Sequence, residues 1–176
     1  MGTASHRSLG WVGAVWGVAG VIGLLSRAIV GLTPLGFGPL LAGELTPIQR
    51  AAWALWAAFM LYTEGWRGFH LAFAPRVVAR AAALIDNPTV LTVLLAPAYC
   101  MALFHAPRRR IIVSWCLLVG IVALVVMVRQ LPEGWRCVVD GGVVLGLSAG
   151  TASVLFHAAR ALAGTAPPKP AELPEG

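Results

Sequence analysis

Charge is scarce in this 176-residue chain, because only 11% of its residues are charged while 59% are hydrophobic. Ordinary soluble domains carry roughly 25% charged residues, so a chain this apolar could not keep its surface in water. Lysine is almost absent, since all but one of the thirteen basic residues are arginine, and only seven residues are acidic. The shortage of charge predicts an integral membrane protein, with lipid as the solvent for most of its side chains.

Patterns for catalysis and metal binding are also missing. The sequence has no phosphate-binding glycine loop, no His-Glu metal motif and no nucleophile elbow. Its cysteines, Cys100, Cys116 and Cys137, form no C-x-x-C pair, which disfavours a zinc or dithiol site. The net charge of +6 comes from arginines near the ends of apolar segments, which favours lipid headgroups over nucleic acid. No catalytic residue is predicted, and nucleic-acid binding is excluded.

Long apolar runs fill most of the chain. They predict an all-α integral membrane bundle of about five transmembrane spans, at residues 9–25, 48–66, 88–105, 111–128 and 137–162. Residues 75–86 separate charged from apolar side chains on two helical faces, which predicts one short amphipathic helix in the membrane interface. The single domain, 9–163, lies between a polar N-terminus, 1–8, and a disordered proline-rich tail, 164–176.

Proline and glycine mark the expected breaks. They are concentrated in residues 31–47, which are predicted to form a loop at the membrane surface. Asn87 and Pro88 are predicted to open the third span, and Pro97 to kink it.

Five spans place the two termini on opposite sides of the membrane. The positive-inside rule puts the short basic loop Arg108–Arg110 in the cytoplasm, so the C-terminus is predicted to be cytoplasmic and the N-terminus outside. Arginine-rich, alanine-rich and glycine-rich usage suits a bacterial inner membrane. Five arginines are expected to meet anionic lipid headgroups, namely Arg76, Arg80, Arg108, Arg109 and Arg110.

Glycines at regular spacing mark possible helix contacts. Gly142, Gly146 and Gly150 recur every four residues in the last span, and Gly13 and Gly17 repeat the spacing in the first. Small residues let two helices approach closely in lipid. These faces either pack the helices within the chain or serve as a docking or self-association surface.

Polar residues within the apolar runs are the next candidates. Asp140 follows Arg136 by four residues, so it is either an ion-paired structural residue or a proton or ion site. The tetrapeptide Glu-Gly-Trp-Arg occurs at Glu64–Arg67 and again at Glu133–Arg136. Each copy is interpreted as an interfacial tryptophan beside a local ion pair, although Glu64 and Arg67 with His70 could bind a headgroup or a quinone-like ring.

Two histidines, His105 and His157, are predicted to lie at similar depth in the last turns of two spans. Such a pair could ligate a haem b iron, with the arginines nearby pairing with its propionates. Histidine near a helix C-terminus is also favoured by the helix dipole without any ligand.

Three hypotheses of function follow from these features. The first is a non-catalytic accessory, assembly or interaction subunit of a larger membrane complex, docking through a glycine face. The second is a small haem-b or quinone-binding electron-transfer protein. The third is a small oligomeric solute or ion carrier built around Asp140.

Overall fold

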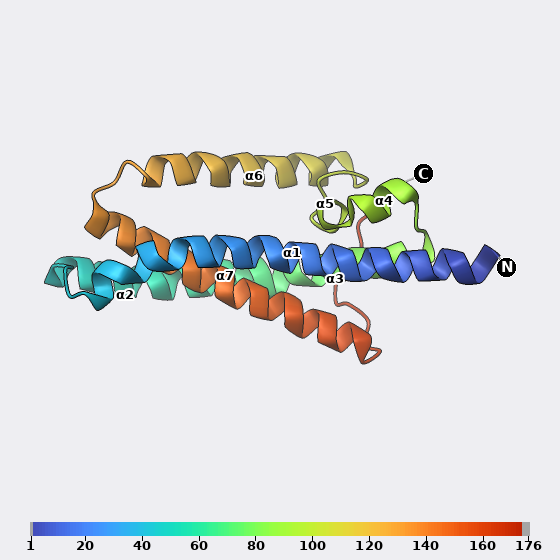
Figure 1. The fold of residues 1–176 in the computed structure, drawn as a ribbon, viewed down its shortest axis with the longest axis horizontal. Coiled ribbons are helices and arrows are strands. Elements are labelled where there is room, and N and C mark those ends of the chain that lie inside the picture. The colour runs from blue at the N-terminus through green and yellow to red at the C-terminus, as the bar shows by residue number, and fades with distance from the viewer. Residues whose placement is uncertain (1, 174–176) are drawn as a thin grey trace.

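The computed structural model describes residues 2–173, and within that range every regular element is a helix. Four helical stretches are long and apolar enough to cross a membrane: His6–Leu41, Pro47–Asp86, Arg108–Val128 and Glu133–Leu162. The all-helical fold is therefore confirmed, with four such stretches instead of the predicted five. Figure 1 shows them as an elongated bundle of long helices. In chain order the elements are α1 (Gly2–Leu41), α2 (Pro47–Met60), η1 (Leu61–Phe73), α3 (Ala74–Asp86), α4 (Val90–Leu94), α5 (Ala96–Cys100), α6 (Arg108–Val128) and α7 (Glu133–Leu162).

The first helix is longer than the sequence predicted. α1 continues through Pro34 and Pro39 to Leu41, so the predicted loop at 31–47 is wrong except for its last few residues. Trp53 Nε1 (3.0 Å) and Cys137 Sγ (3.3 Å) donate to the carbonyl oxygen of Gly36, which lies between the two prolines. Proline removes the helix bond to the carbonyl four residues earlier, at Val30 and Leu35, so the two bonds to Gly36 are additional contacts that hold this part of α1 against α2 and α7.

The second helical stretch joins three elements without a break. α2 begins with a capping box between Thr46 and Gln49, and it passes directly into the π-helix η1 and then into α3. The separate interfacial helix predicted at 75–86 is therefore wrong. α3 continues the rod Pro47–Asp86 and buries its apolar face in the core, because the glycines of α1 let its backbone approach closely.

The segment predicted as a third span is broken. Thr89, and not Asn87, caps α4 through a capping box with Thr92. Pro97 then lies in the first turn of α5, so it starts a new five-residue helix and does not kink a long one. Ala102 and His105 both adopt positive φ, which turns the chain toward α6.

The bundle core lies between α1, α3 and α5, and α7 contributes Val154 to it. Its buried apolar residues include Val21, Val77, Leu84, Ala96, Cys100 and Val154. α6 lies apart from this core, and Val128 is its one buried residue. Only 6% of its most apolar 18-residue stretch is buried, against 50% of the corresponding stretch of α7. Figure 1 shows α6 alongside α1 and joined to the rest mainly at its two ends.

Four long helices return the chain to the end where it starts. The turns after α1 and after α6 lie at one end of the bundle, while the N-terminus, the segment between α3 and α6 and the C-terminal segment lie at the other (Figure 1). The described chain therefore begins and ends at the same end of the bundle, whereas five crossings would have left the two ends apart; on which side of a membrane they lie stays a prediction. Residues 164–173 form no helix, yet part of them packs against α3; residues 174–176 of the predicted tail lie outside the described range.

Candidate functional site

The predicted glycine faces are covered by the chain itself. A Cβ atom on Gly150 would lie 2.5 Å from the ring of Phe69, and one on Gly146 would lie 3.3 Å from Glu64 Cβ. Gly142 meets Trp56 in the same way, so this face of α7 packs on the rod. In α1, Gly13 meets Leu84 and Val93, and Gly17 meets Cys100 and Ala96. The structure therefore favours intrachain packing for both faces and leaves neither open for docking.

Arg80 is the most completely bonded polar side chain of the structure. Its residue is only 1% exposed, and its guanidinium lies 4.3 Å from the ring centre of Tyr99. All five N–H donors of an arginine are used here, each on a backbone carbonyl oxygen. Nε donates to Tyr99 (2.6 Å), Nη1 to Ala171 and Glu172 (3.0 Å each), and Nη2 to Phe104 (3.2 Å) and His105 (2.9 Å).

Arg80 was predicted to contact lipid headgroups, but in this structure it is buried and its donors are occupied by backbone carbonyl oxygens. It is the residue that ties α3 to α5, to the turn before α6 and to the C-terminal segment. The burial of Arg80 could have been predicted from its spacing. It lies three residues after Val77 and four before Leu84, which places it on the apolar face of the helix. The prediction had placed Arg80 with Arg76 on a polar face.

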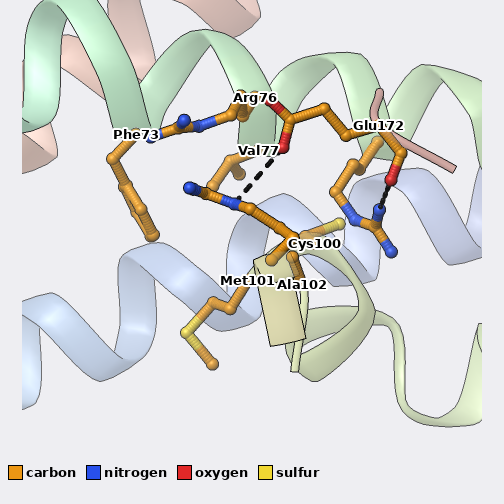
Figure 2. Close-up of a pocket in the computed structure, with 9 residues that line it drawn as sticks. Phe73, Arg76, Val77, Cys100, Met101, Ala102 and Glu172 are labelled. Atoms are coloured by element: carbon orange, nitrogen blue, oxygen red, sulfur yellow. Dashed lines mark hydrogen bonds and ion pairs between the residues drawn. The ribbon is translucent and has the colours of Figure 1, made fainter. Parts of the chain in front are cut away.

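A small cavity of about 10 Å³ lies beside Arg80, enough for one water-sized molecule (Figure 2). Arg76 and Arg110 line it together with Glu172, whose Oε2 lies 3.4 Å from Arg110 Nε. Within the described part of the chain, the Nε atoms of Arg76 and Arg110 are buried without a hydrogen-bond partner. Three guanidinium groups therefore lie around one carboxylate, and Arg110 Nε meets it as an ion pair too long for a good hydrogen bond.

The thiol of Cys100 also lines this cavity. Burial raises the pKa of Cys100 to about 12, although the positive charge of Arg80 acts in the opposite direction. The thiol therefore stays protonated at neutral pH and adds no negative charge against the three arginines.

The remaining basic residues of the predicted headgroup contacts differ in exposure. Arg108 and Arg109 are exposed in the first turn of α6, as expected of residues that could meet headgroups, whereas Arg76 and Arg110 are half-buried around the cavity.

The histidines combine differently from the prediction. His157 contacts His70, with ring centres 5.0 Å apart, whereas the ring contact recorded for His105 is with Tyr99 at 6.0 Å. His157 Nε2 lies 3.1 Å from the carbonyl oxygen of His70, so this ring nitrogen already has a backbone partner. The structure thus brings together His70 and His157, and haem ligation by His105 and His157 stays a prediction.

The polar residues of η1 surround the first Glu-Gly-Trp-Arg copy. His70 stacks on Trp66 with ring centres 4.6 Å apart, while Glu64 and Arg67 are exposed. The ion pairs among the described residues are Arg110–Glu172 and Arg136–Asp140, so the predicted local pairs within the two tetrapeptides are wrong. In the first copy the cause is the wider turn of the π-helix, which does not align residues three apart.

Asp140 is 5% exposed and its Oδ2 lies 3.3 Å from Arg136 Nε, one turn earlier in α7. This geometry is that of an ion-paired structural residue, the first of the two interpretations of Asp140, because a buried carboxylate needs a partner for its charge. In the second tetrapeptide, Arg136 thus pairs forward along α7 with Asp140 and not back with Glu133.

The fold and these contacts define a class of protein: an all-helical chain with four helices long and apolar enough to cross a membrane. Comparison with known protein families, with curated proteins and with solved structures finds no match. Function is therefore argued from the geometry alone.

Proposed function

We propose that this chain is a multi-pass membrane protein that acts as a non-catalytic subunit of a larger membrane assembly, and that α6 contacts a transmembrane helix of a different polypeptide. The observation that carries the proposal is the isolation of α6. It is the most apolar of the four long helices, because its most apolar 18-residue stretch has a mean hydropathy of 3.0. Only 6% of that stretch is buried inside the structure. The other three stretches have mean hydropathies between 1.3 and 1.8.

Small residues on α6 support a helix as the partner. Gly120 has no atom within 4 Å of the place of a Cβ, unlike the glycines that pack α7 on the rod, although Gly23 and Gly38 of α1 are open in the same way. Glycine within a helix costs about 1 kcal/mol relative to alanine, so an uncontacted one is unfavourable for the isolated chain. Cys116 lies four residues earlier and is also exposed. This spacing is the one through which helices approach closely in lipid.

Photo-crosslinking in the native membrane tests the α6 proposal. A photoreactive residue at Leu117 is expected to give one discrete crosslinked product, and Gly120→Leu is expected to abolish it. The variant should still fold, since position 120 contacts nothing in its own chain. The same probe at Leu155, an exposed residue of α7, is the control and should give no discrete product.

Two outcomes would contradict the proposal. Equal, diffuse labelling from positions 117 and 155 would mean that α6 simply faces lipid. A product of twice the 18.5 kDa chain mass would identify a second copy of this chain instead of a different subunit.

For the orientation, the positive charges support placing both termini in the cytoplasm of a bacterial cell, with the protein in the inner membrane. Of the thirteen basic residues, eight belong to the end of the bundle that holds the termini and three to the opposite end, while Arg27 and Arg67 lie within the long helices between the two ends. Since basic residues are retained on the cytoplasmic side, this imbalance favours one orientation. The first group is Arg7, Arg76, Arg80, Arg108, Arg109, Arg110, Arg160 and Lys169, and the second is Arg50, Arg129 and Arg136.

Reporter fusions test this orientation. A fluorescent protein that matures only in the cytoplasm should fluoresce when fused to either terminus, and a periplasm-specific phosphatase should be inactive at both. Phosphatase activity at the N-terminus alone would place the two termini on opposite sides of the membrane, as five crossings would. Activity at both termini would invert the orientation.

A further inference from the structure

The C-terminal segment occupies the donors of a basic cluster that consists of Arg76, Arg80 and Arg110. Glu172 brings its carboxylate to Arg110, and its own carbonyl oxygen and that of Ala171 accept both Nη1 hydrogens of Arg80. Figure 2 shows Glu172 reaching over the cavity, with dashed lines marking its contacts to cationic side chains.

Displacing this segment would release a set of converging donors. The two Nη1 hydrogens of Arg80 and the Nε of Arg110, which is ion-paired with Glu172, would become free next to the Nε of Arg76, which has no hydrogen-bond partner among the described residues. Guanidinium donors in this number match the oxygens of a phosphate group, for which arginine is the preferred side chain.

The charges of the surroundings also favour an additional anion. One carboxylate faces three guanidinium groups, and the first turn of α6 contains Arg108, Arg109 and Arg110 without any acidic residue. The N-terminus of a helix already carries a partial positive charge, so cations there repel it and an anion is stabilised. Glu172 itself has a φ of 47°, an unfavourable backbone conformation for a residue other than glycine.

We propose that Arg76, Arg80 and Arg110 form a binding site for a phosphate group, which Glu172 and the adjacent backbone occupy in this structure as an internal, displaceable substitute. When phosphate binds, it replaces the carboxylate on Arg110 and the two carbonyl oxygens on Arg80. The C-terminal segment then leaves α3, so ligand binding and release of the segment are coupled.

The place of the site in the fold favours a lipid headgroup as the source of the phosphate. The apolar run of α6 begins at Ile111, directly after Arg110. If α6 crosses the membrane, Arg110 is at the depth of the headgroups, where phosphodiesters of anionic lipids are abundant. Free inorganic phosphate has the same chemistry and is distinguished by the experiment.

Lipid binding by the full chain in an uncharged detergent tests the site, with native mass spectrometry as the readout. Phosphatidylglycerol is the probe, and phosphatidylcholine is the zwitterionic reference. Glu172→Gln, which removes the competing charge, is expected to tighten phosphatidylglycerol binding by about fivefold. Arg110→Gln is expected to weaken it by about tenfold. Arg109→Gln is the matched control, one residue away and exposed, and should change it by less than about twofold.

Competition with inorganic phosphate identifies the source. Displacement of phosphatidylglycerol by excess phosphate would show that the site accepts phosphate itself, and retention of the lipid would show that the lipid is required; both results support the site. Equal losses in Arg110→Gln and Arg109→Gln would reduce the effect to general surface charge and overturn the proposal. An unchanged affinity in Glu172→Gln would show that the C-terminal segment does not compete and would overturn it as well.

Discussion

Replacing Arg80 with leucine is expected to cause the largest loss of stability of any single substitution at the sites described above. The change leaves five backbone carbonyl oxygens without the donors they have in the structure. A buried acceptor left without its donor typically costs about 1–3 kcal/mol, so losing several together is a large part of the stability of a small domain. The free energy of unfolding, measured by denaturant titration in mixed micelles, checks this expectation.

Two further arginine variants make the Arg80 result specific. Arg67→Leu removes an exposed arginine from the same helical rod and is expected to change stability by less than about 0.5 kcal/mol. Arg80→Lys keeps the charge but offers only three donors without the planar fork, so it should fall between the two. If Arg80→Leu proved as stable as Arg67→Leu, the five hydrogen bonds would contribute little to the fold.

The second large effect is expected from Gly36→Ala. A Cβ atom on Gly36 would lie 2.5 Å from the backbone nitrogen and 2.7 Å from the Cα of Gly141 in α7. These are backbone atoms, which cannot rotate away as a side chain would, so the two helices must separate. Overpacking of this kind typically costs about 1–3 kcal/mol, and the hydrogen bonds from Trp53 and Cys137 to the Gly36 carbonyl would weaken as well.

Gly38→Ala is the matched control for Gly36→Ala. It lies two residues away in the same helix, with nothing within 4 Å of its Cβ position, and alanine is the better helix former by about 1 kcal/mol. We expect the thermal unfolding temperature to fall for Gly36→Ala and to stay constant or rise for Gly38→Ala. Similar decreases in both variants would mean that α1 and α7 do not meet at Gly36.

Hydropathy was sufficient to predict the class of fold and the position of its most apolar helix. The uncharged run 111–128 corresponds to α6, and the apolar run that begins at 137 lies within α7. These predictions succeed because an apolar run of about 20 residues has few alternatives to a helix, which satisfies its backbone hydrogen bonds internally.

Local rules for proline and glycine failed where distant residues decide the structure. Pro34 and Pro39 indicated a loop, but the Gly36 carbonyl between them receives donors from Trp53, 17 residues away, and from Cys137, 101 residues away. Within 88–105, the two capping threonines and Pro97 divide the segment into short helices, which a hydropathy window does not detect.

The basic cluster was equally inaccessible to local reasoning. Arg80 binds carbonyl groups 91 and 92 residues further along the chain, and the sequence of the C-terminal segment indicates disorder. Helical periodicity could have placed Arg80 beside Val77 and Leu84, although it could not have identified the partners of the guanidinium.

The position of α7 has a consequence for how the protein is made. Translation proceeds from the N-terminus, so α1 and the rod are synthesised before α7, which packs against both of them. Until then, Gly36 and the indole groups of Trp53 and Trp56 lack their contacts with α7. The nascent chain must therefore hold two long helices with an incomplete interface until α7 and the segment that bonds Arg80 have been synthesised.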